Sequence, residues 1–318
     1  MRDFSGEIDN LIDNLREYLD SLPWTLPDSE WQKTLEGIQE KTQPLLQTFG
    51  ELVGEGKEEE YTPIVGEALE RLALASRRPA YVSSFAEGIG TRLYPLLLTV
   101  YHLGILAHFH GRPNYLRLLL TLQLPVSVRT NDENTALLPK LRNRFYSYTN
   151  QLFERLYPGR CMPLSWHLYK LLFVNPGVTR SNLPDKVKEE GSLYSSLNDP
   201  EGALATYLEG EFVLGLLALK PQLAIENPQP LLGLYAAVSP ALYIEYIEED
   251  TRLFSRIERL VSQPPAHLCQ VLELSGKTLK EYLEALVRSI SNMTLGGTCH
   301  SASEVYKRLS QGQLGSCA

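Results

Sequence analysis

The sequence predicts an all-α protein, an irregular multi-helix bundle or helical array without a sheet. Apolar residues recur three and four positions apart through most of the chain, which is the spacing of one face of an amphipathic helix. Glycine and proline interrupt these patterns at positions typical of helix ends. The nearest approach to a strand, residues 124–128, is short and contains Pro125, so we expect no β-structure.

The run from Arg92 to Leu120, RLYPLLLTVYHLGILAHFHGRPNYLRLLL, predicts a buried helical hairpin at the centre of the core. It is apolar on nearly every face, then stops at Gly111 and restarts at Pro113. A membrane span needs about 20 uninterrupted apolar residues, and Arg92 and three histidines interrupt this run. A glycine in mid-helix, Gly104, predicts that another helix crosses closely there.

Helical patterns also precede this hairpin. Ser5 is a candidate cap for a first helix, and Asp28 or Ser29 starts a second, which we expect to kink or restart at Pro44. The polar run 54–60, GEGKEEE, predicts a flexible hinge. A third element follows it. The apolar stripes of the three elements comprise Ile8, Leu11, Ile12, Leu15 and Leu19, then Trp31, Leu35 and Ile38, then Val65, Leu69, Leu72 and Ala73.

Beyond the hairpin we expect a helix over 134–157 and a shorter one around Trp166. Later helical patterns cover 201–219, 229–262, 265–274, 277–292 and 302–310. The predicted domains are therefore an acidic N-terminal helical arm, 1–60, and a main helical body, 61–318. The turn-rich stretch 175–200 is a second candidate boundary.

Charge is distributed unevenly along the 318 residues. Residues 1–70 carry 17 acidic and 5 basic side chains, whereas residues 71–170 carry 4 acidic and 13 basic ones. We expect the acidic arm either to pair with the basic middle of its own chain, masking it, or to meet a separate partner. The acidic N-terminus does not have the pattern of a signal peptide, and four cysteines without paired spacing suit a reducing cytoplasm.

The sequence signals for a catalytic or metal site are weak. His102, His108 and His110 fall on different faces of a helix, so we interpret them as core or helix-end residues. Cys299 and His300 are adjacent and do not form a facing pair. The acidic run 245–250 with Arg252, Arg256 and Arg259 reads as an exposed, salt-bridged helix face. We therefore predict no catalytic, cofactor-binding or metal-binding residue.

The segment 139–170 combines basic and aromatic residues. A protein partner, or the chain's own acidic arm, explains this composition best, and contact with nucleic acid is the alternative. The predicted partner or nucleic-acid patch comprises Lys140, Arg142, Arg144, Arg155 and Arg160.

The central run also resembles a segment in helical regions of bacterial defence-associated proteins. It has a Tyr-Pro helix start, an aromatic-x-x-Gly-Ile centre at Tyr101–Ile105, and a short break before a leucine-rich helix. Tyr207–Leu219, YLEGEFVLGLLAL, is similar to a Phe-Glu-x-Leu-Leu-x-Leu element of those regions. There, such segments accompany sirtuin-like or nucleoside-triphosphatase effector domains. The resemblance implies a recognition or scaffolding component of an anti-phage system, with its enzyme on another chain.

Two classes of function follow. The favoured one is a non-enzymatic interaction protein, a scaffold or regulatory subunit, that binds a protein partner and no membrane. The alternative is an enzyme whose site is assembled from residues far apart in the sequence, or a nucleic-acid-binding helical protein.

Overall fold

Helices are the only regular structure in the described part of the chain, which confirms the all-α prediction. The computed structural model describes residues 3–23, 29–75, 86–122, 153, 155–158, 163–185, 200–223, 251–274 and 279. The elements are α1 (Phe4–Ser21), α2 (Trp31–Glu55), α3 (Glu58–Ala75), α4 (Ala86–Phe109), α5 (Pro113–Thr121), α7 (Pro163–Tyr169), the π-helix η1 (Lys170–Val174), α8 (Val178–Ser181), α10 (Pro200–Leu223), α13 (Thr251–Ser262) and α14 (Ala266–Leu272). None of these described helices is long and apolar enough to cross a membrane.

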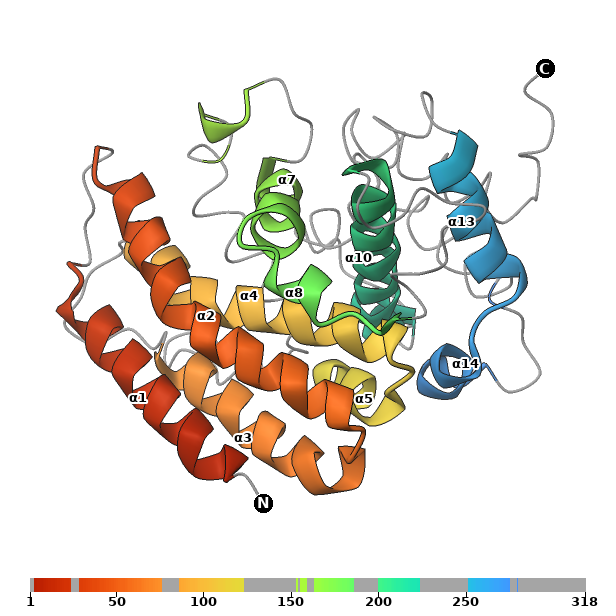
Figure 1. The fold of residues 1–318 in the computed structure, drawn as a ribbon, viewed down its shortest axis with the longest axis horizontal. Coiled ribbons are helices and arrows are strands. Elements are labelled where there is room, and N and C mark those ends of the chain that lie inside the picture. Colours follow the sequence, from red (N-terminus) through yellow and green to blue (C-terminus); the bar gives the residue numbers. More distant parts are fainter. Residues whose placement is uncertain are drawn as a thin grey trace.

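α2 and α3 pack on α4, and α1 packs on α2 and α3. Figure 1 shows α1, α2 and α3 running side by side, with α4 against α2 and α3. The predicted apolar stripes face this contact, because Ile8, Leu35 and Leu69 are almost fully buried. α1 is capped by Asp3 and not by Ser5, since the Asp3 carboxylate accepts from the Gly6 amide at 3.1 Å. α2 does not restart at Pro44 but continues through it.

The predicted hinge at 54–60 is a tight turn. α2 ends at Glu55, Gly56 adopts a left-handed φ of 78°, and α3 begins at Glu58. Residues from both sides of the predicted boundary between 60 and 61 belong to one hydrophobic core, for example Phe49 and Val65. The division into 1–60 and 61–318 stays a prediction. If it holds, the two parts share one hydrophobic core.

The central hairpin is formed by α4 and α5, as predicted. Every residue from 91 to 107 is buried, so this part of α4 is covered on all sides. The helix ends at Phe109, the chain turns at Gly111, whose φ is 66°, and the Arg112 amide donates back to the Ala107 carbonyl at 2.7 Å. Pro113 is the first residue of α5, where its missing amide hydrogen is not needed.

The close crossing predicted at Gly104 is present. A Cβ atom on Gly104 would overlap Leu214 Cδ2 of α10, and one on Gly210 of α10 would lie 2.7 Å from Ile105 Cγ1 of α4. Glycines on both helices therefore let the two backbones approach, each opposite a bulky residue of its neighbour.

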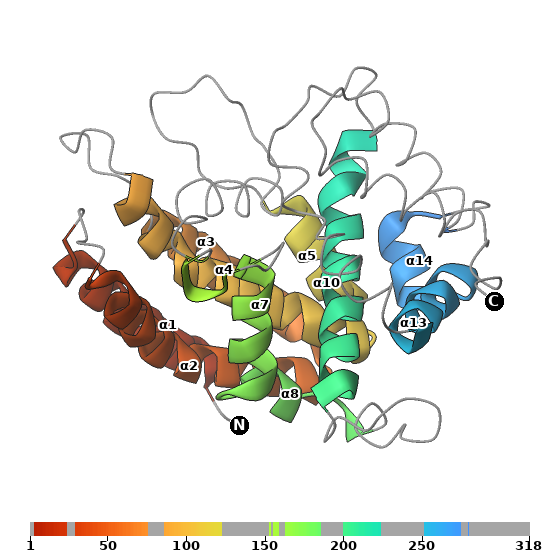
Figure 2. The same ribbon diagram turned by 90° about the horizontal axis from the view of Figure 1, so that it is seen from above.

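Among the later helices, α8 contacts α2 and α4, and α10 contacts α4. Figures 1 and 2 show α7 and α10 beside α4, with α13 and α14 beyond α10. α7, α10 and α14 confirm the predicted helices around Trp166, over 201–219 and over 265–274. Most of the predicted helix over 134–157, and the patterns over 229–250, 277–292 and 302–310, lie outside the described residues, apart from isolated positions.

Candidate functional site

The described polar groups of most interest gather around α10. This helix is buried on nearly every side between residues 206 and 218, yet its sequence includes Glu209 and Glu211. Residues two apart on a helix lie about 200° apart around the axis, so the two carboxyl groups face opposite directions. Each meets a different set of helices, and each organises its own polar cluster.

Glu209 holds together three helices. Its Oε1 atom lies 3.0 Å from Nε2 of His108, the penultimate residue of α4. Its Oε2 atom accepts from Nε of Arg256 in α13, which also donates through Nη1 to Thr206 Oγ1 at 3.0 Å. The side chains are largely withdrawn from water, at 3% exposed for His108, 12% for Glu209 and 15% for Arg256.

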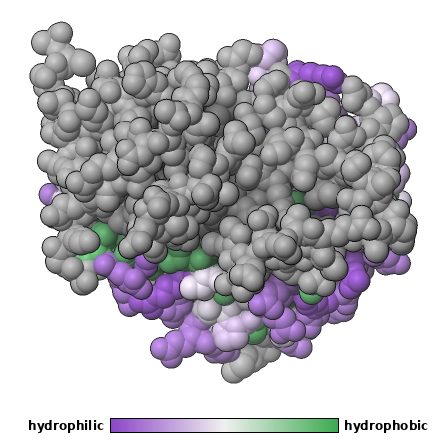
Figure 3. Space-filling view, turned by 180° about the vertical axis from the view of Figure 1, so that it is seen from behind, coloured by the Kyte–Doolittle hydropathy of each residue, from purple (hydrophilic) through white to green (hydrophobic). Residues whose placement is uncertain are grey.

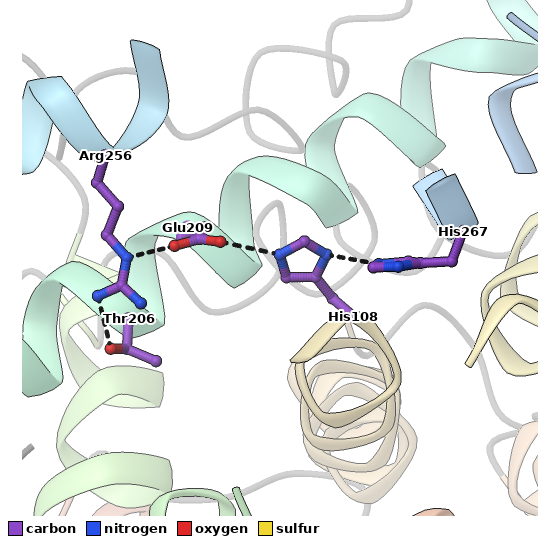
Figure 4. A network of polar contacts seen from close by, with 5 residues as sticks. All are labelled: His108, Thr206, Glu209, Arg256 and His267. Carbon is purple, nitrogen blue, oxygen red and sulfur yellow. Dashed lines mark hydrogen bonds and ion pairs between the residues drawn. The ribbon is translucent and has the colours of Figure 1, made fainter. Parts of the chain in front are cut away.

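His267 extends this cluster to α14. Its Nε2 atom lies 3.2 Å from Nδ1 of His108, and the two rings are 5.3 Å apart at their centroids. Figure 4 shows the resulting line of side chains, from Arg256 through Glu209 and His108 to His267. We call these four residues the Glu209 cluster. It joins α13, α10, α4 and α14, and its histidines are 159 residues apart in the sequence.

The charges of the Glu209 cluster determine where its hydrogens lie. Burial on its own raises the pKa of Glu209, but the hydrogen bond to His108 and the charge of Arg256 outweigh burial and lower it. An ionised carboxylate only accepts hydrogen bonds, so Nε2 of His108 must carry a hydrogen. The other ring nitrogen, Nδ1, faces Nε2 of His267.

Glu211 organises a second cluster, built from hydroxyl groups. Its Oε1 atom accepts from Ser165 Oγ of α7 at 2.7 Å, from Tyr101 of α4 at 3.2 Å and from Tyr207 at 3.4 Å. The residue is 1% exposed. Three hydroxyl groups thus hydrogen-bond one oxygen of this buried carboxyl group, and they connect α10 to α4 and α7.

A third cluster surrounds His167 of α7. Tyr94 of α4 and Gln39 of α2 reach its Nε2 atom at 2.6 and 3.1 Å, and the Tyr157 hydroxyl lies 3.1 Å from Nδ1. Burial, together with the positive charge of Lys170, lowers the pKa of His167 to about 4. His167 is therefore a neutral hydrogen-bonding link between helices near pH 7.

The structure places the predicted patch only in part. Arg155 is described and exposed, whereas Lys140, Arg142, Arg144 and Arg160 lie outside the described residues. Cys269 is a free, partly buried thiol, and Cys299 with His300 also lies outside the described ranges.

The three histidines of the central run have the separate surroundings expected of core and helix-end residues. His102 is fully buried, with Nδ1 2.8 Å from Thr179 Oγ1. His110 follows the end of α4, and its Nε2 atom lies 2.9 Å from the Asn182 carbonyl oxygen. No group of three or more His, Cys, Asp and Glu side chains is arranged to hold a metal ion within the ranges the structure describes.

The prediction that Arg256 lies on an exposed, salt-bridged helix face is wrong. Arg256 points inward because Glu209, in another helix, offers a buried carboxylate, while Arg259 stays exposed. Sequence reasoning also missed Glu209, Glu211, His167 and His267 as members of clusters. The available signal was the presence of two glutamates inside an apolar helix, because such residues are seldom buried unless they are paired.

Comparison of the chain with protein-family models, with curated proteins and with solved structures gives no match. The case for a function therefore depends on the residues and geometry described above.

Proposed function

We propose that this chain is a non-enzymatic interaction protein, a scaffold or regulatory subunit, that binds a protein partner with a basic surface. The observation that carries the proposal is the acidic surface of α1, α2 and α3, which has ten exposed carboxylates against three exposed basic residues. Its carboxylates are Asp13, Glu17, Asp20, Glu36, Glu40, Glu55, Glu59, Glu60, Glu67 and Glu70. The described residues along the lower edge of the molecule, where α1 and α3 lie, are mainly hydrophilic (Figure 3).

An acidic surface of this kind favours a basic partner for two reasons. Like charges on neighbouring helices repel one another, and a basic partner relieves that repulsion. Complementary charge also raises the association rate and discriminates against wrong partners. The helices beneath the surface are held by the shared core, so they present the charges on a fixed framework.

The resemblance to defence-associated helical regions supports a more specific role. Its two segments, 92–120 and 207–219, meet where α4 and α10 cross at Gly104 and Gly210. They therefore belong to one packed unit. We propose on this basis that the chain is the recognition component of a bacterial anti-phage system and that the partner is the effector.

The test is co-purification of the full chain with the protein encoded by each adjacent gene, followed by titration of the purified pair. Glu36→Lys combined with Glu40→Lys should weaken binding, and Lys33→Glu combined with Lys41→Glu on the same helix should strengthen it. Binding should also weaken as salt rises, because exposed charges are screened over about 8 Å at physiological ionic strength.

The opposite signs expected of the two double variants separate docking from damage to the fold. If both variants weakened binding equally, or neither changed it, the acidic surface would not be the docking site. Tight binding of labelled single-stranded RNA or DNA by the full chain, without any protein partner, would favour the nucleic-acid alternative.

A further inference from the structure

We propose that His108 and His267 bind a divalent metal ion of the zinc type, with Glu209 as the carboxylate that orients His108. The first argument is distance. Nδ1 of His108 and Nε2 of His267 face each other at 3.2 Å. Two imidazole nitrogens bound to zinc at about 2.0–2.1 Å in a tetrahedral site lie about 3.3–3.4 Å apart. The two nitrogens are thus spaced nearly as in such a site, and the ion would lie to one side of the line that joins them, with both rings turned toward it.

The second argument is the orientation of the His108 ring. Nε2 lies 3.0 Å from Oε1 of Glu209, so the other ring nitrogen, Nδ1, is the one that faces His267. A metal ion needs the form of the ring in which one nitrogen bears a hydrogen and the other bears a lone pair.

The third argument is the support behind His108. Metal-binding histidines usually donate their second N–H to a carboxylate or a carbonyl, which fixes the ring and raises its basicity. Glu209 has this position, and Arg256 holds the other oxygen of the same carboxylate. Arg256 is in turn fixed by Thr206, so the orienting group is itself held in place.

The site is partly open to solvent. His108 is almost fully buried, whereas His267 is partly exposed at the start of α14. An ion can thus arrive from the α14 side, with water filling the coordination positions that the two histidines leave. The sequence did not suggest this pair, because helical spacing separates His108 from His102 and His110, and its partner lies on a helix 159 residues away.

The test uses the full-length chain, stripped with a chelator and alkylated at its four cysteines so that thiols do not bind zinc. Calorimetric titration with Zn²⁺, and with Co²⁺ monitored by visible absorption, should show about one ion per chain. His267→Gln should weaken binding at least about tenfold, and Glu209→Gln about 10–100-fold. His110→Gln is the matched control and should leave binding unchanged, since His110 bonds to the Asn182 carbonyl instead.

Two results would overturn the proposal. One is the absence of stoichiometric Zn²⁺ and Co²⁺ binding by the wild-type chain, which would leave only a hydrogen bond between the two rings. The other is equal binding by wild type and by His267→Gln. If removal of the buried His108 disturbs folding, the partly exposed His267 still gives an answer, provided that its variant unfolds at the wild-type temperature without metal.

Discussion

His102 and His108 are six residues apart on α4 and have opposite surroundings. His102 lies among apolar neighbours and contacts the Thr179 hydroxyl, and its burial lowers its pKa to about 3. His108 instead donates to an ionised carboxylate and faces a second imidazole. The same residue type thus serves as a neutral core group in one place and as a link in a charged chain in the other.

The pKa of His102 predicts that acid destabilises the fold. With a folded pKa of about 3 and an ordinary value of 6.5, the unfolded chain binds a proton below pH 6.5 that the folded chain does not bind. Stability is therefore lost as the pH falls from about 6.5 toward 3, at about 1.4 kcal/mol per pH unit. His167 acts in the same direction, since its pKa is about 4.

Urea unfolding at pH 7 and pH 4.5 tests this expectation. The wild type should lose on the order of 2–3 kcal/mol more between the two values than His102→Gln, which cannot take up the proton. Asp and Glu residues titrate in both proteins, so their effect cancels in the comparison. Equal losses in the two proteins would mean that His102 does not stay neutral in the fold.

The glycines at the α4–α10 crossing predict unequal effects of added side chains. Gly104→Leu should cost about 1–3 kcal/mol, because even its Cβ would overlap Leu214. Gly210→Ala should also destabilise the protein, since the atoms in its way include the branched Cβ of Ile105, which cannot swing aside. Gly54→Ala is the control: nothing lies within 4 Å, so it should be neutral or stabilising by up to about 1 kcal/mol. The melting temperatures of the three variants test this expectation. A melting temperature of Gly104→Leu at or above the wild-type value would contradict the close crossing of α4 and α10.

At the scale of elements, two arginines attach α1 to the rest of the fold in different ways. Arg92 of α4 is 2% exposed, and its Nη2 atom donates to the Leu19 and Leu22 carbonyls at 3.0 and 2.7 Å. The Leu19 carbonyl also accepts from the Leu22 amide at 3.2 Å, so Arg92 adds a second donor there and supplies a donor to the carbonyl of Leu22, the C-cap of α1. Arg71 of α3 pairs with Asp9 and Asp13, but those carboxylates are 51% and 66% exposed.

We therefore expect Arg92 to matter more than Arg71. Arg92→Met should cost about 1–3 kcal/mol, because it removes the charged hydrogen-bond donor that these two carbonyls share. Arg71→Met should cost about 1 kcal/mol or less, because water screens exposed ion pairs. Chemical unfolding of both variants measures the difference, and hydrogen exchange should locate the loss for Arg92→Met in α1. A larger effect of Arg71→Met would show that surface pairing holds α1.

The sequence predicts some features of these elements well and others poorly, for physical reasons. The α4–α5 hairpin was predictable because Gly111 and Pro113 act locally, on the turn in which they lie. The start of α1 was missed because Asp3 and Ser5 can both cap a helix, and only geometry shows which carboxylate or hydroxyl reaches an amide. The continuity of α2 through Pro44 depends on packing against α4, which outweighs one lost hydrogen bond.

The candidate site was less predictable than the fold. Glu209, His108 and His267 lie in three helices that meet only when the core assembles, so no local spacing brings them together. The helical spacing that argues against a metal site applies only to His102, His108 and His110, which belong to one segment. The same holds for Arg256. The charge pattern around it in the sequence is typical of an exposed helix face, and only the folded structure brings the buried Glu209 carboxylate to it.

At the scale of the whole molecule, the described helices share one hydrophobic core that runs from Phe4 to Leu279. The N-terminal helices are thus not an appendage: α1 packs on α2 and α3, and α2 packs on α4. Their acidic residues face outward while their apolar residues cover the central hairpin. The same residues 1–60 therefore supply both most of the proposed docking surface and part of the core.

This arrangement predicts that residues 61–318 do not form a native fold alone, contrary to the expectation from the predicted hinge. Deleting residues 1–60 removes thirteen buried apolar side chains and exposes the sides of α3 and α4 that they cover. Each buried side chain contributes about 1.5–3 kcal/mol. The total free energy of unfolding of a protein is only about 5–15 kcal/mol. Exposing a few of the side chains on α3 and α4 that residues 1–60 cover would therefore be enough to unfold the fragment. Circular dichroism of the fragment should show helices without a cooperative thermal transition, and adding a peptide of residues 1–60 should restore the transition. A cooperative transition by the fragment alone would instead establish 1–60 and 61–318 as separate units, and the acidic surface would then be free to move relative to the body.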